Sequence, residues 1–176
     1  MVVLHRIDSV SDKWYEEFYT IYSQSFPVYE QRDEKQQECA FNNTNYHLDC
    51  FIDDHKFLAF IAYWDFDNYI YIEHFAVNPE YRGENIGSNT LRNFIEDKKK
   101  MILLEIDPPV NEIAQKRLKF YEKLGFVSNP YSHHHPAYKK DYPPHELIVL
   151  SMDKALEQSS YDRFYQELSH IVMKQN

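Results

Sequence analysis

Glycine is scarce in this chain of 176 residues. It has three glycines, whereas an average usage of about 7% would give about a dozen in a chain of this length. They lie in two short segments, Gly83 and Gly87 in YRGENIGSNTL and Gly125 in YEKLGF. Because glycine permits positive φ angles and close approach of the backbone, we expect each one to meet a local need of the backbone.

Cysteine and long apolar runs are also scarce. Cys39 and Cys50 are the two cysteines and form no CxxC motif, so we expect neither a disulfide framework nor a cysteine zinc site. No apolar run approaches the roughly 18 residues of a membrane-spanning helix, and the start of the chain, MVVLHRIDSV, lacks the apolar segment of a signal peptide. The sequence therefore predicts a cytoplasmic protein without a membrane partner.

Positive charge is in deficit. The formal net charge is −9, which disfavours a nucleic-acid partner, because such binding depends on Lys and Arg neutralising phosphates. An acidic protein attracts cationic substrates. The alternative is that the acidic surface only keeps the protein soluble.

The hydrophobic pattern predicts an α/β (α+β) fold in one domain with a C-terminal tail. A three-stranded antiparallel meander is expected in the middle of the chain, where two turn-like segments, DDHK and DFDN, separate apolar runs. We expect strands at residues 2–7, 47–52, 57–64, 69–77, 101–107 and 146–152 and a short one from Phe126. We expect helices from Ser11 to near Pro27, over 30–40, after Gly87, over 111–124 and in the tail.

The glycine segment after the third meander strand predicts an anion site. A strand that runs through a glycine-bearing loop into a helix leaves the first helical N–H groups unpaired, and the helix dipole is positive there. Two phosphate-loop motifs are excluded, because no Lys follows Gly87 as in GxxxxGK[ST] and GENIG is not GxGxxG. The alternative is an ordinary turn, with Gly83 for bending and Gly87 for packing.

The stretch IEHFAVNPEYRGENIGSNTL, followed by MILLEI and RLKFYEKLGF, resembles the GNAT superfamily of acyl-CoA-dependent N-acyltransferases. The resemblance covers about residues 1–152, with its specific motifs in 71–126. It implies a GNAT fold, in which a mixed, mostly antiparallel sheet has helices on both faces, and a domain over 1–152 with a helical extension over 153–176. In the family signature R/Q-x-x-G-x-G/A, Arg82, Asn85 and Gly87 fill the defined positions, so Asn85 replaces a glycine.

The resemblance implies a site for acetyl-CoA. The N–H groups from Gly83 to Ser88 would hold the pyrophosphate and Arg82 would add charge, while the backbone of Phe75–Val77 would pair with the pantetheine arm. Val77 N–H would donate to the thioester carbonyl. We expect Asn85 to adopt the left-handed conformation that the family builds with glycine. The predicted cofactor-binding residues are Phe75, Ala76, Val77, Arg82, Gly83, Glu84, Asn85, Ile86, Gly87 and Ser88.

Two residues match family positions for proton transfer. Glu73 resembles the carboxylate base of many members, with a salt-bridged strand residue as the alternative. We expect strand alternation to place Glu73 and His74 on opposite faces. Tyr121 matches the general acid, with a core tyrosine as the alternative. Seven positions before Tyr121 stands Ala114, where many relatives have an Asn.

The segment between the last strands is rich in Tyr, His and Pro. Its position resembles the acceptor pocket of the family, and we expect Tyr131, His135 and Tyr138 to contact substrate. A surface loop packed by its own aromatics is the alternative. We expect no metal site at the three adjacent histidines, because neighbours on an extended chain point apart.

The predicted function is N-acetyl transfer from acetyl-CoA to a primary amine, carried by a small molecule or a peptide, by direct attack in a ternary complex. A non-catalytic acyl-CoA-binding module is the alternative, and a metal-dependent protein is a third hypothesis. The aromatic tail, YDRFYQELSHIVM, could pack on its own domain or on a second copy in a homodimer. The acceptor and the acyl chain length are not readable from the sequence.

Overall fold

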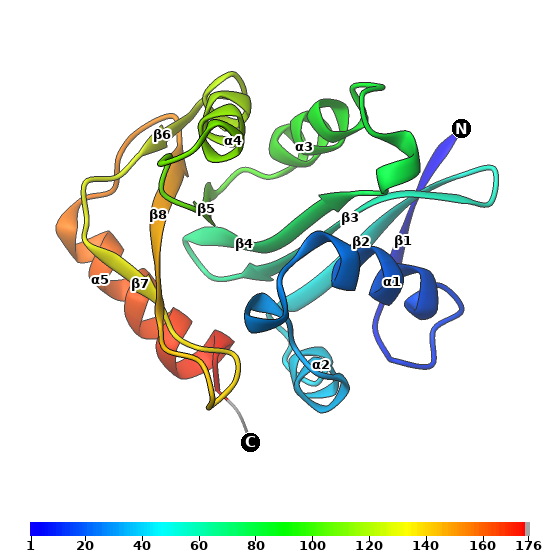
Figure 1. Cartoon of the computed structure of the whole chain (residues 1–176), viewed down its shortest axis with the longest axis horizontal. Helices are drawn as coiled ribbons and strands as arrows, with labels where there is room; N and C mark the ends of the chain where they lie inside the picture. Colours follow the sequence, from blue (N-terminus) through cyan, green and yellow to red (C-terminus); the bar gives the residue numbers. More distant parts are fainter. Residues whose placement is uncertain (175–176) are drawn as a thin grey trace. The chain divides into compact units, whose positions relative to one another are not determined.

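The computed structural model describes residues 1–174, which form two compact units, residues 1–100 and 101–174. The predicted boundary of the acyltransferase domain at residue 152 stays a prediction. The last two residues of the predicted tail, 175 and 176, lie outside the described part of the chain. Figure 1 labels the elements of both units.

The first unit contains a four-stranded antiparallel sheet in the order β1-β2-β3-β4. Its strands are β1 Val2–Ile7, β2 Tyr46–Asp53, β3 Lys56–Asp65 and β4 Tyr69–Val77. Its helices are α1 Tyr15–Ser25, α2 Glu34–Phe41 and α3 Ile86–Asp97, with 3₁₀ turns at Val28–Glu30 and Pro79–Tyr81.

The meander predicted over residues 47–77 is confirmed and spans residues 46–77 in the structure. Asp53 pairs with Lys56 across the tip of the β2–β3 hairpin, and Asp54 and His55 both have positive φ, 46° and 67°. Two positive φ values match a two-residue turn whose twist suits the flanking strands. The DDHK segment is therefore the turn that its polar residues indicate.

Helices cover both faces of this sheet, with α1 and α2 on one side and α3 on the other (Figure 1). Phe18 of α1 meets Phe60 of β3 edge-to-face at 4.8 Å, and Phe94 of α3 meets Tyr63 of β3 at 5.0 Å. All four rings are almost fully buried. Aromatic side chains thus form the core on both faces, which accounts for the high aromatic content of the chain.

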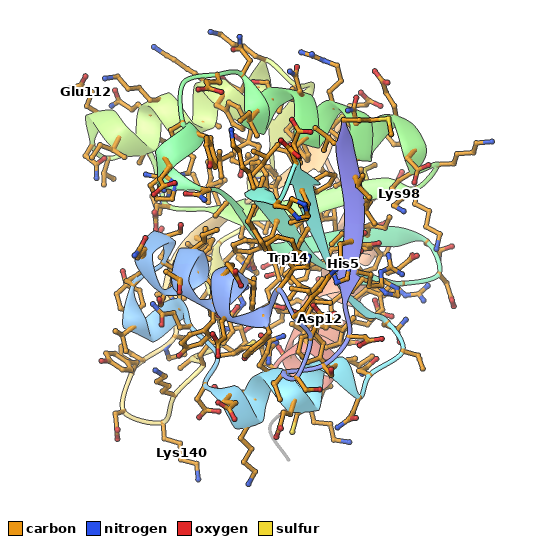
Figure 2. All side chains as sticks on the ribbon, turned by 90° about the vertical axis from the view of Figure 1, so that its right-hand side faces the viewer. His5, Asp12, Trp14, Lys98, Glu112 and Lys140 are labelled. Atoms are coloured by element: carbon orange, nitrogen blue, oxygen red, sulfur yellow. The ribbon has the colours of Figure 1, made fainter. Side chains whose placement is uncertain are left out.

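The start of the first helix differs from the prediction. Ser11 does not cap it, because α1 begins at Tyr15 and its preceding residue, Trp14, gives no side-chain cap. Instead, the Asp12 carboxylate accepts from Trp14 N–H at 2.8 Å and contacts His5 Nε2 of β1 at 2.9 Å. Figure 2 shows these three side chains together where β1 leads into α1. The Asp12 turn replaces a helical turn at this point.

The predicted helix over residues 30–40 is a 3₁₀ turn followed by α2, which begins at Glu34. The Asp33 side chain accepts from Gln36 N–H and the Gln36 side chain accepts from Asp33 N–H, at 2.8 and 2.9 Å. This capping box fixes the start of α2 four residues after the predicted one. The residues before it, 31–33, are extended and carry Arg32 into the core.

The second unit has β8 His145–Met152 paired antiparallel with β5 Met101–Ile106, β6 Phe126–Ser128 and β7 His133–His135. Its helices are α4 Glu112–Glu122, α5 Gln158–Glu167 and a π-helix over Leu168–Val172. Gly125 follows α4 with a φ of +97°, which is common for glycine after a helix, and a Cβ there would lie 3.3 Å from Met152 Sδ. β7 is a strand within a segment whose sequence indicates only a loop.

The tail is helical in its described part. The turn that leads to α5 is held by Asn129, whose side-chain oxygen accepts from Leu156 N–H at 2.6 Å. Tyr161, Phe164 and Leu168 of the tail are buried. Among residues 1–174, the structure has no helix whose length and apolarity would allow it to cross a membrane.

Candidate active site

The segment between β4 and α3, where the sequence predicts an anion site, contains two left-handed residues. Gly83 has a φ of +91° and Asn85 a φ of +59°, both left-handed. The predicted backbone of Asn85 is thus confirmed, and Asn is among the residues that reach this region at low cost. Residues 82–85 are exposed, so the turn presents its backbone to solvent.

The first turn of α3 has no competing group. Asn85 precedes the helix but makes no side-chain cap, and the first turn carries no acidic residue. The first helical hydrogen bond runs from Asn89 N–H to Asn85 C=O at 2.9 Å, so the N–H groups of Ile86, Gly87 and Ser88 have no partner within the helix. The partial positive charge of the N-terminus favours a phosphate here.

The end of β4 offers backbone groups on one edge. Asn78 N–H donates to Leu58 C=O of β3 at 2.8 Å, and Val77 lies opposite Ala59. Because backbone groups alternate in direction along a strand, the N–H of Val77 points away from β3, and so does that of Phe75. These are the two groups that an extended chain along this edge would pair with.

Glu73 lies at a β-bulge. Ala62 pairs with His74 and Tyr63 pairs with Ile72, so Glu73 is the extra residue on β4. Its carboxylate Oε1 accepts from Arg32 Nε at 3.1 Å and lies 2.9 Å from Arg32 Nη2. The side chains of Glu73 and Arg32 are 0% and 5% exposed. Bulges re-aim side chains, and this one directs a carboxylate into a buried ion pair.

The expectation that Glu73 and His74 face opposite sides is wrong. Their side chains are 3.9 Å apart, and both contact the segment between α1 and α2. His74 Nε2 lies 2.9 Å from Glu30 C=O, two residues before Arg32. The bulge is the cause, because an inserted residue interrupts the alternation of a strand.

Arg32 and Trp64 belong to this cluster, although no sequence motif marks either of them. Trp64 Nε1–H donates to Glu73 Oε2 at 2.7 Å, and the Arg32 guanidinium lies 5.8 Å from the Trp64 ring centroid. A lone arginine in a polar stretch resembles any surface residue in sequence. Arg32 is buried in a segment, residues 31–33, that is extended in the structure. The predicted helix over 30–40 gave no indication that this position is buried.

Tyr121 is a buried residue of α4 in the second unit. Its ring meets Phe126 edge-to-face at 5.7 Å. Burial raises the pKa of Tyr121 to about 12, and Arg117 partly offsets this rise. The phenol therefore keeps its proton through the neutral range, so it can donate a hydrogen bond to a developing thiolate.

The three predicted acceptor residues all lie in the second unit, in ring stacks. Tyr131 stacks on Tyr161 at 4.1 Å and donates to Leu156 C=O at 2.6 Å. His135 stacks on Tyr138 at 5.0 Å, and both are buried. The segment thus packs partly on its own aromatic rings and partly on Tyr161 of α5, and contact with substrate stays a prediction. Asn111 caps α4 by accepting from Ala114 N–H at 2.9 Å.

Residues 12–126 match the sequence model of the acetyltransferase (GNAT) family, and this range includes both β4 and the turn at residues 82–85. The chain belongs to the acetyltransferase (GNAT) family. The match spans more than half of the chain and contains Glu73, Asn85 and Tyr121. The resemblance seen in the sequence is therefore confirmed.

Similar proteins agree with this assignment. A GNAT-family protein from Bacteroides thetaiotaomicron has 30% identity and a TM-score of 0.89, with 99% of each chain covered. The Bacillus subtilis protein YjbC, named as a candidate acetyltransferase, is 29% identical over 117 residues, 64% of this chain and 56% of YjbC. The aligned part thus spans about half of that relative. Arabidopsis thaliana Naa50, solved with the bisubstrate analogue CoA-Ac-MVNAL, has 22% identity, 85% and 97% coverage and a TM-score of 0.61.

The GNAT fold predicted from the sequence is confirmed by these structures, above all by the Bacteroides protein, which matches the chain from end to end. The acetyltransferase assignment is also confirmed at the level of the family. The acceptor, the individual site residues and the route of acyl transfer are not decided by the match, so they belong to the proposal below.

Proposed function

We propose that this GNAT protein transfers an acetyl group from acetyl-CoA to a primary amine by direct attack in a ternary complex. The observation that carries the proposal is the turn at residues 83–85, where two left-handed residues, Gly83 and Asn85, precede the N-terminus of α3 in the segment that follows β4. The N–H groups at the start of α3 and the positive charge of Arg82 support a pyrophosphate at this turn. The fold relative Naa50 was solved with one molecule that joins CoA, acetyl and peptide, which supports a ternary arrangement.

The chain supplies binding and polarisation. Bound acetyl-CoA would bring an activated thioester, whose carbonyl oxygen gains negative charge as the amine attacks. Val77 N–H, on the β4 edge away from β3, is suited to donate to that oxygen. The Tyr121 hydroxyl would donate to the departing sulfur. A phenol with a pKa of about 12 stabilises a thiolate mainly through a hydrogen bond.

The role of Glu73 as a base stays a prediction. Both of its oxygens accept hydrogen bonds from Arg32 and Trp64, an arrangement that favours an anchoring role. The ion pair joins β4 to the residues between α1 and α2. In this interpretation Glu73 shapes the site, and the proton of the amine leaves by another group.

Thermal unfolding with acetyl-CoA, free CoA and ATP tests the cofactor assignment. Ligand at about 100 times its Kd adds roughly 2.7 kcal/mol of stability, which raises the midpoint by about 5–10 °C in a chain of this size. We expect both CoA forms to raise the midpoint and ATP to have little effect. Arg82→Ala should reduce the rise, whereas Arg92→Ala, an exposed α3 residue outside the turn, should leave it unchanged. No rise with either CoA form would refute the proposal.

Turnover is measured by thiol release with three amines, spermidine, a lysine-containing peptide and a peptide with a free N-terminus. The net charge of −9 favours a cationic acceptor. Acetylation of at least one of them is expected. CoA binding without turnover of any amine would instead support the non-catalytic binding module.

A further inference from the structure

The bulge of β4 decides which backbone groups this strand presents on the edge away from β3. Before the bulge, the N–H of Phe66, directly after β3, donates to Tyr69 C=O at 3.0 Å. Tyr69 and the odd-numbered residues that follow it therefore direct their backbone groups towards β3. After the bulge, Asn78 N–H donates to Leu58 C=O, so here the even-numbered residues do so. The extra residue, Glu73, shifts the alternation by one position.

A regular ladder would present the other set of groups. In such a ladder Glu73 would pair with Ala62, one residue out of the observed register. Phe75 and Val77 would then turn their N–H groups towards β3. The apolar pattern does not choose between the two registers, because residues 75–77 are all apolar and suit either face of the sheet. The observed register therefore depends on contacts that only the bulge allows.

His74 makes the contact that is specific to the bulge. Alternation along a regular strand would place its side chain on the face opposite to that of Glu73. In the structure both side chains reach one short segment, in which Glu73 pairs with Arg32. His74 Nε2 lies 2.9 Å from the C=O of Glu30, two residues before Arg32. A carbonyl oxygen only accepts, so Nε2 carries the hydrogen and the contact needs no change of protonation.

The surroundings of the His74 ring hold it on this face. The ring is 5% exposed and meets Tyr22 and Phe26 edge-to-face, at 4.9 and 4.7 Å. The segment that receives it is fixed to α1, because Arg32 N–H donates to the Tyr22 hydroxyl at 2.7 Å. Gln31 Nε2–H also donates to Phe26 C=O at 2.6 Å. In the other register the His74 ring would leave these contacts for the face that α3 covers (Figure 1).

We propose that His74 is a positioning residue for acetyl transfer, which fixes the register of β4 so that the N–H groups of Phe75 and Val77 point away from β3. The inference rests on the proposed function, in which these two groups meet the pantetheine arm and the thioester carbonyl of acetyl-CoA. His74 acts through the backbone and not by touching the ligand. Its contact with Glu30 C=O holds the strand, and the strand presents the donors.

Amide hydrogen exchange measured by NMR tests the register without a ligand. In the wild type, Ala76 N–H points towards β3 and should exchange slowly. His74→Phe keeps a ring beside Tyr22 and Phe26 but loses the donor. Loss of this buried hydrogen bond should make Ala76 exchange about 10–100-fold faster. The rise should exceed that of the amides between β2 and β3, because the change is local to β4.

Three further variants make the test specific. Gln37→Met removes another buried donor of the first unit, which contacts the Tyr46 hydroxyl at 2.9 Å, and should affect both ladders alike. His74→Gln retains a side-chain N–H and should keep the slow exchange of Ala76. If His74→Phe does not fold, Phe26→Leu removes one ring beside His74 and should speed the same amide selectively. Equal changes in the two ladders would overturn the proposal.

Cofactor binding then connects the register to function. A misplacement of about 1 Å can cost about 10²-fold in rate. His74→Phe should therefore raise the Kd of CoA and lower kcat/KM for acetyl-CoA, each by about 10–100-fold. His74→Gln should restore both values, and Gln37→Met should keep both even where its unfolding midpoint falls as far as that of His74→Phe. A folded His74→Phe protein with the CoA affinity of the wild type would refute the positioning role.

Failure of this inference is distinguishable from failure of the proposed function. If the wild type binds no CoA, the proposed function fails, and with it the role of His74 in acetyl transfer. The exchange of Ala76 still decides whether His74 sets the register of β4. If the wild type binds CoA and His74→Phe changes neither the exchange pattern nor the affinity, the acetyl-CoA assignment stands and the inference about His74 falls.

Discussion

The ion pair of Arg32 with Glu73 allows a quantitative test of the first unit. Glu73→Gln keeps an acceptor for Trp64 Nε1–H but leaves the Arg32 guanidinium, 5% exposed, without its counter-charge. Removing one partner of a buried pair typically costs about 3–5 kcal/mol. At about 2–4 °C per kcal/mol for a chain of this size, the unfolding midpoint should fall by roughly 6–20 °C.

A matched control and a double variant make the test specific. Glu112 pairs with Lys116 on the surface, with side chains 79% and 73% exposed, so Glu112→Gln should cost less than about 1 kcal/mol. Figure 2 shows the Glu112 side chain pointing outward from its helix. Adding Arg32→Met to Glu73→Gln removes the second charge of the pair as well, and the double variant should be more stable than Glu73→Gln alone. The assay is circular dichroism during heating.

Turnover then separates anchoring from base catalysis. Measured well below its own midpoint, Glu73→Gln should keep the pH dependence of kcat/KM, because the proton of the amine does not pass through residue 73 in the proposed mechanism. A stable Glu73→Gln protein that has lost the acid limb of the profile would refute this reasoning and restore Glu73 as the base. An unfolding midpoint of Glu73→Gln equal to that of Glu112→Gln would show that the Arg32–Glu73 pair does not contribute the expected stability.

Two further predictions concern the sequence motifs. Asn85→Gly should leave CoA affinity equal or improved, because glycine adopts the left-handed conformation of Asn85 (φ +59°) without a side chain. Calorimetric titration measures this affinity, and a large loss would identify the Asn85 amide as a specific contact. Tyr121→Phe should lower kcat about 10²-fold or more without a change in CoA affinity. In the wild type, the pH profile should show no alkaline limb from this phenol below about pH 11, since burial raises the pKa of Tyr121 to about 12. Full turnover of the variant would exclude a catalytic role of Tyr121.

The parts predictable from the sequence are those with a local cause. The meander is encoded by apolar runs between polar turns, and its observed strands begin and end within one residue of the predicted limits. Asn85 and Gly125 have the positive φ that their motifs require. Each of these features needs only a few neighbouring residues, which a single sequence displays.

The parts that escaped prediction depend on pairing between distant segments. The bulge at Glu73 exists because β4 has one residue more than β3 between the pairs Ala62–His74 and Tyr63–Ile72. The sequence IEHF contains no residue that indicates a bulge. Because of this bulge, the His74 side chain lies near that of Glu73 and not on the opposite face of the sheet. Arg32, 41 positions before Glu73, is buried where this carboxylate pairs with it.

Glu105 shows that some distant pairings do leave a signal in the sequence. A carboxylate inside an otherwise apolar strand must find hydrogen-bond donors when the strand is buried, and a histidine-rich segment follows in the same chain. Together, these two features predict a contact between Glu105 and a histidine. Neighbouring histidines on an extended chain point apart, but the first and the third share a face. The alternation that argues against a three-histidine metal site is therefore what brings His133 and His135 to one carboxylate.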